Sequence, residues 1–169
     1  MSTEPSAALA GRAPPASSAR QTVIQGGRAK VYRPLPDADR LRALRKGLAA
    51  YRRGDFFEAH ELLEPAWMGA SDPAERDYHQ GLIKLAAAYV HAVRGNPLGM
   101  AKNLAGARAR LAETARAGGA PIARLARPKA GVDLDLDALL VAIDDRLERL
   151  ARGERVPPST APKLTRRSG

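Results

Sequence analysis

The chain has 169 residues and a net charge of +10, and only 4% of its residues are aromatic. A chain of this length suits one domain with a self-supporting core. Cysteine is absent, which excludes disulfides and thiolate metal sites and favours a reducing cytoplasm. No apolar run reaches the length of a signal peptide or a membrane span. We therefore expect a cytoplasmic protein without a membrane partner.

Both ends of the chain are predicted to be disordered basic tails. Residues 1–36 contain too few large apolar side chains to fold, and prolines in residues 153–169 exclude a helix. The tails have net charges of +4 and +3, which leaves only +3 for the helical domain expected at residues 37–152. Basic tails attract nucleic acid or an acidic protein partner weakly, while a solubilising role explains the same charge without a partner.

Between the tails, the spacing of apolar residues predicts helices and no strand. The expected helices cover residues 39–53, 55–68, 73–94, 97–116 and 136–152, with a short turn near residues 121–127.

The third of these helices has a clear beginning and an unusual composition. Asp72 is the expected N-cap, Pro73 takes the first helical position, and Glu75 completes a capping box. At 100° per residue its apolar side chains cover two opposite sides, which is typical of a buried helix. We therefore predict an all-α bundle of about five helices around this central helix.

Polar residues interrupt the apolar stripe of the second helix, in the sequence "DFFEAHELLEPAW". On a helical projection, His60 falls in the middle of the core-facing stripe, Glu64 lies beside it one turn later, and Glu61 flanks it. Trp67 lies on the same stripe. Pro65 has no N–H to donate to the carbonyl of Glu61, so the helix is expected to kink there.

The third helix contributes two more polar residues. Gln80 and His91 are eleven residues apart, which returns them to the same face within about 20°. His79 is turned by about 100° from Gln80 and is less clearly inside the core.

The segments "FFEAHELLEPAW" and "HQGLIKLAAAYVHAVRGNP" resemble the domain-of-unknown-function family DUF309, over about residues 40–115. The resemblance implies a small all-helical fold and a shared polar cluster, and it implies no activity. The sequence departs from the family pattern at Lys84, where a Gln is expected. The matching positions are Phe56 or Phe57, His60, Glu61, Glu64, Trp67, Gln80, Gly81, His91, Gly95 and Asn96.

Two functions fit the polar cluster. A buried hydrogen-bond network of His60, Glu64 and Gln80 would be structural, and the domain would then be a non-enzymatic interaction or scaffold domain without a cofactor. The absence of an evident nucleophile or Gly-rich phosphate loop favours this interpretation. Alternatively, His60, Glu61 and Glu64, with His91, form a site for a metal or small ligand, which could support hydrolysis. His60 and Glu64 are one turn apart and could bind the same ion, whereas Gln80 and His91, about 16 Å apart, could not.

Weak, non-specific nucleic-acid binding is a third hypothesis, through the tails and the basic residues of the first and fourth helices. These residues lie mainly outside the leucine stripes, so a solvated helix face also explains them. They are Arg40, Arg42, Arg45, Lys46, Arg52 and Arg53 in the first helix, and Lys102, Arg108, Arg110 and Arg116 in the fourth.

Overall fold

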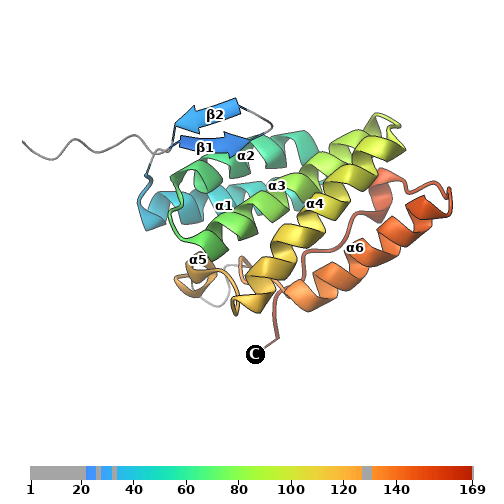
Figure 1. The fold of residues 1–169 in the computed structure, drawn as a ribbon. Coiled ribbons are helices and arrows are strands. Elements are labelled where there is room, and N and C mark those ends of the chain that lie inside the picture. The colour runs from blue at the N-terminus through green and yellow to red at the C-terminus, as the bar shows by residue number, and fades with distance from the viewer. Residues whose placement is uncertain (1–21, 26–27, 32–33, 127–130, 169) are drawn as a thin grey trace, which may run out of the picture.

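The computed structural model describes residues 22–25, 28–31, 34–126 and 131–168 (Figure 1). Helices dominate this part of the chain, which confirms the predicted all-α class. The helices are α1 (Asp37–Arg52), α2 (Phe56–Gly69), α3 (Pro73–Val93), α4 (Pro97–Arg116), α5 (Pro121–Arg124) and α6 (Leu136–Ala151).

Helix α3 lies at the centre of the bundle, as its composition predicts. It packs against α2 and α4, while α1 packs on α2 and α6 on α4 (Figure 1). Tyr78, Leu85 and Tyr89 of α3 are almost completely buried. The expected N-cap is also present, because the side chain of Asp72 accepts a hydrogen bond from the backbone N–H of Glu75 at 2.9 Å.

Two glycines allow neighbouring helices to approach closely. A Cβ atom on Gly81 of α3 would lie 2.7 Å from Cγ of Leu111 in α4, and one on Gly47 of α1 would lie 2.5 Å from Cγ of Leu63 in α2. Both distances are far shorter than carbon–carbon contacts allow. The glycine that follows Gln80 in the sequence motif therefore has a packing role.

The N-terminal segment differs from the prediction of a disordered tail. Strands β1 (Thr22–Gln25) and β2 (Arg28–Val31) form an antiparallel hairpin, in which Thr22 pairs with Val31. A β-prone run on each side of two glycines is a hairpin signal that the sequence does contain. The remaining part of the predicted tail, residues 1–21, lies outside the described residues.

The C-terminal segment is the second difference, because residues 153–168 pack on the helices instead of forming a disordered tail. Val156 and Leu164 are buried, and the hydroxyl of Tyr51 donates to the carbonyl of Pro162 at 3.2 Å. The guanidinium of Arg146 donates to the carbonyl of Thr160 from Nε and Nη2, at 3.1 and 2.9 Å. The prolines do exclude an α-helix here, and only a short 3-10 helix, η2 (Pro158–Thr160), forms. A segment of this kind can still bury apolar side chains and hydrogen-bond through its carbonyls.

Candidate functional site

His60, Glu61 and Glu64 lie together on α2. One potential ligand atom from each of these residues lies within 4.8 Å of the others, and Nδ1 of His60 is 3.1 Å from Oε1 of Glu61. The side chains of His60 and Glu61 are 30% and 55% exposed, so the cluster reaches the surface.

The predicted place of His60 in the middle of the core-facing stripe is therefore wrong. The buried arc of α2 includes two alanines, Ala59 and Ala66, as well as Leu63 and Trp67. These small residues shift the centre of the arc away from His60, which falls at its edge. Its exposure argues against His60 as a buried residue that stabilises the fold through a hydrogen-bond network.

The other predicted cluster residues do not join this group. Trp67 is buried, and the guanidinium carbon of Arg76 lies 5.4 Å from the centre of its ring. Gln80 is half-buried on α3. His91 lies at the α3–α4 junction, where its Nδ1 is 3.2 Å from Nδ2 of Asn96.

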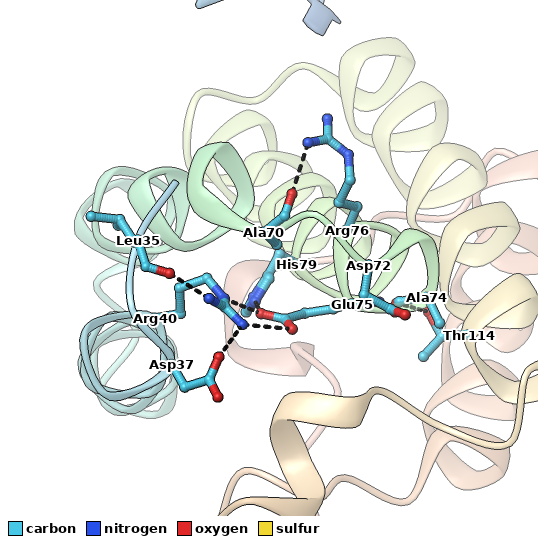
Figure 2. Close-up of polar contacts among 10 residues, drawn as sticks. All are labelled: Leu35, Asp37, Arg40, Ala70, Asp72, Ala74, Glu75, Arg76, His79 and Thr114. Atoms are coloured by element: carbon cyan, nitrogen blue, oxygen red, sulfur yellow. Dashed lines mark hydrogen bonds and ion pairs between the residues drawn. The ribbon is translucent and has the colours of Figure 1, made fainter. Parts of the chain in front are cut away.

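A different buried polar cluster joins α1 to α3, and its members are Arg40, Glu75 and His79 (Figure 2). Nε of Arg40 donates to Oε1 of Glu75 at 2.6 Å, and Nε2 of His79 lies 3.2 Å from the same oxygen. Arg40 also donates to Oδ1 of Asp37 at 2.7 Å and to the carbonyl of Leu35. Glu75 and His79 are 2% and 0% exposed, respectively, so this cluster, and not one around His60, forms a buried hydrogen-bond network between helices.

The sequence contains a partial signal for this cluster. The sequence predicts a capping box formed by Asp72 and Glu75. Asp72 does cap α3, but the carboxylate of Glu75 points to Arg40 and His79. Glu75 and His79 are four residues apart on one helix, a spacing at which side chains meet. Arg40 is 35 residues away from Glu75, and only the packing of α1 on the bundle brings it there.

The electrostatics favour a charged glutamate and a neutral histidine. Burial by itself would raise the pKa of Glu75, but hydrogen bonds from His79 and Arg40 outweigh it and hold the pKa below its usual value. Burial lowers the pKa of His79, against the opposing effect of Glu75. Neutral His79 thus donates a hydrogen bond from Nε2 to the carboxylate of Glu75. Its Nδ1 is a buried acceptor that has no hydrogen-bond partner in the described part of the chain.

The basic residues of α1 and α4 do not form a continuous cationic surface. Most of those predicted as nucleic-acid contacts are paired with acids, including Arg42 with Asp39 at 2.8 Å and Arg110 with Asp77 at 2.8 Å. Paired guanidinium groups are poor phosphate ligands because their charge and donors are already engaged. This arrangement favours the solvated-face interpretation of these residues.

Exposed apolar side chains gather instead where α3 ends and α4 begins. Val93 is 65% exposed and Leu98 is 83% exposed. Both line a groove of about 900 Å³ between the start of α4, the end of α6 and the C-terminal segment. Leu147 and Leu150 of α6 and Val156 lie on its other side.

Comparison with known proteins finds one family to which part of this chain is similar. Residues 44–103 match the family model described as "Domain of unknown function (DUF309)". This part of the chain is similar to DUF309 domains. No curated protein and no solved structure matches the chain.

The DUF309 match confirms the resemblance based on the motif, and the match covers all of α2 and α3. The family description assigns no activity. Within the described residues, no helix combines the length and apolar character needed to cross a membrane.

The structure divides the DUF309 motif by physical role. Trp67 and Gly81 serve packing, Gly95 has a positive φ of 66° after α3, and Asn96 caps α4 by accepting from the N–H of Gly99 at 2.9 Å. These residues are explained by the fold. His60 and Glu61, whose side chains reach the surface, are motif residues that neither packing nor capping explains.

Proposed function

We propose that this DUF309 domain is a non-enzymatic interaction domain that binds an acidic, amphipathic segment of a partner protein in the groove between α4 and α6. The observation that carries the proposal is the pair of exposed apolar residues, Val93 and Leu98, at the edge of the groove. Contiguous exposed apolar surface is uncommon on monomeric proteins and marks interaction sites. Grooves between helices are suited to the apolar face of an amphipathic helix.

The charges around the groove favour carboxylates on the partner. Glu154 accepts hydrogen bonds from Arg149 at 3.1 Å and from Arg152 at 2.8 Å, so its charge is compensated within the domain. Arg155 on the groove wall and Arg94 next to Val93 have no ion pair with any described residue. The start of α4, which also lines the groove, adds the partial positive charge of a helix N-terminus. An acidic segment complements these groups.

Substitution of Leu98 by Asp is expected to weaken binding of such a segment about ten- to a hundredfold, because a buried leucine contributes about 1.5–3 kcal/mol. The probe is a labelled synthetic helical peptide with leucines on one face and glutamates beside them, and fluorescence anisotropy measures its affinity. Leu98 is exposed in the second position of α4, where an Asp is compatible with folding.

The matched control is Val141→Asp. Val141 is 70% exposed on α6 and does not line the groove, so this variant should bind like the wild type. Equal affinity of the Leu98→Asp and Val141→Asp variants would refute the groove as the binding site. Equal binding of a peptide with lysines in place of glutamates would refute the acidic partner.

Metal binding at His60, Glu61 and Glu64 is the second candidate function, and the short distances among their ligand atoms favour it. One imidazole and two carboxylates suit Zn²⁺ or Mn²⁺, and three protein ligands leave coordination positions for water. Ligand atoms around such an ion lie about 3 Å apart, so small rotations of partly exposed side chains would assemble the site. Pro65 also leaves the carbonyl of Glu61 without its helical hydrogen bond.

Titration of tag-free protein with Zn²⁺ and Mn²⁺ by calorimetry tests the metal site. We expect one equivalent to bind, and we expect His60→Ala and Glu64→Gln to lower the affinity at least about tenfold because each removes one of three ligands. Glu58→Gln, on the same helix but outside the cluster, should leave the affinity unchanged. Undiminished affinity in His60→Ala would place any bound metal elsewhere.

A further inference from the structure

A second depression lies on the other side of Val93, between the start of α2 and the end of α3. It has a volume of about 530 Å³, and Phe56, Phe57, Val90 and Val93 form its apolar lining. The depression has both buried and exposed residues in its lining, and its two adjacent phenylalanines show this contrast most clearly.

Phe56 and Phe57 are the only phenylalanines of the chain, and only one of them serves the core. The ring of Phe56 is buried, with its centre 5.3 Å from that of Tyr51 and 5.2 Å from that of Tyr89. Phe57 is 63% exposed at the edge of the depression. A large exposed aromatic ring beside an apolar depression is the usual composition of an interface anchor and its pocket.

Charges of both signs surround this apolar centre. Asp55 and Glu58 lie on the α2 side and are 56% and 53% exposed, and both contact Arg53, at 3.3 and 3.2 Å. Arg94 lies on the α3 side without an ion pair to any described residue. A twofold axis along the boundary between the two edges places the α2 edge of one copy against the α3 edge of the other. Asp55 and Glu58 share a single arginine, so a negative charge remains on the α2 edge to face Arg94 of the other copy.

We propose that this depression is the interface of a homodimer with twofold symmetry, in which Phe57 of each copy inserts into the depression of the other. Such an interface uses the same patch on both copies, so the patch must contain both the projecting group and its pocket, as well as both signs of charge. This patch contains all four. The depression shares Val93 with the groove between α4 and α6, but Leu98 lines only the groove, so variants at Leu98 and Phe57 test the two sites separately.

Sedimentation velocity of the full chain over a concentration series tests the dimer. The wild type is expected to dimerise at micromolar concentrations, and Phe57→Glu is expected to weaken dimerisation at least about tenfold. Val141→Glu, an equally exposed site on α6, should dimerise like the wild type, and circular dichroism should show that both variants are folded. A wild type that remains monomeric at millimolar concentration, or a dimer unaffected by Phe57→Glu, would overturn the proposal.

Disulfide trapping gives a second measurement because the chain has no cysteine of its own. Under mild oxidation, a mixture of Glu58→Cys and Arg94→Cys chains, which both keep Phe57, should form a covalent dimer rapidly, whereas Val141→Cys should do so only at the slow rate of random collisions. Equal rates would contradict the proposed twofold contact.

The Leu98→Asp variant separates this inference from the proposed function. It should lose peptide binding and keep dimerisation. If the wild type is monomeric but still binds the acidic peptide through Leu98, the homodimer is wrong and the interaction function stands. If Leu98→Asp abolishes the dimer and Phe57→Glu does not, the copies associate through the groove and the depression is not the interface.

Discussion

Replacement of Glu75 by Ala should lower the free energy of unfolding by about 3–5 kcal/mol, because it leaves Arg40 and His79 without their shared buried partner. The side chains of Arg40 and Glu75 are only 13% and 3% exposed, so water cannot replace the lost contacts fully. Urea unfolding followed by circular dichroism measures the effect. The matched control is Glu113→Ala, whose ion pair with Arg116 is exposed on both sides, and which should cost less than about 1 kcal/mol.

The pH dependence of stability is a further readout of the same cluster. The pKa of His79 is lowered by burial from its usual value of 6.5, so stability is complete above that pH and decreases as the unfolded chain takes up a proton that the native chain excludes. The pKa of Glu75 is also lowered, from 4.5, which adds a second loss of stability below that pH. Wild-type stability should thus fall on acidification from about pH 7, and the component below pH 4.5 should be smaller in Glu75→Ala. A wild-type stability that is constant between these pH values would contradict the charge assignment.

Replacement of Trp67 by Ala should cost about 3–5 kcal/mol, the range for removal of a buried aromatic side chain. Trp67 is 2% exposed, and the guanidinium of Arg76 covers its ring. Because Trp67 is the only tryptophan, urea unfolding must be followed by circular dichroism and not by fluorescence. Trp67→Phe should be less damaging, since it retains much of the apolar area.

Phe57→Ala is the control for the tryptophan prediction. Phe57 belongs to the same helix but is 63% exposed, so its removal should change the monomer's stability by no more than about 0.5 kcal/mol. The comparison must be made at a concentration where the protein is monomeric. A loss for Trp67→Ala as small as that for Phe57→Ala would contradict a core role for Trp67.

The contrast between these two aromatic residues also bears on the DUF309 motif. Trp67 and Gly81 are needed for packing, whatever the domain binds. Variants at these positions will report on folding in any functional assay. His60 and Glu64 are the motif positions at which a loss of binding can be separated from a loss of stability.

The sequence alone determined the features that depend on neighbouring residues. Apolar spacing placed the long helices and identified α3 as central, while local hydrogen-bonding rules identified Asp72 as a cap. The motif also indicated the family whose model matches residues 44–103. These predictions succeed because helix periodicity and capping act over a few residues, within reach of a pattern in the chain.

The tertiary structure alone decided which polar groups are buried and which are exposed. The projection of α2 could not show that Ala59 and Ala66 are buried, and so it placed His60 in the core. Arg40 meets Glu75 across 35 residues, and the carbonyl of Thr160 meets Arg146 only because the proline-rich end of the chain returns to the bundle. Burial and long-range hydrogen bonding depend on how whole elements pack against one another, and a local pattern of residues carries no record of that packing.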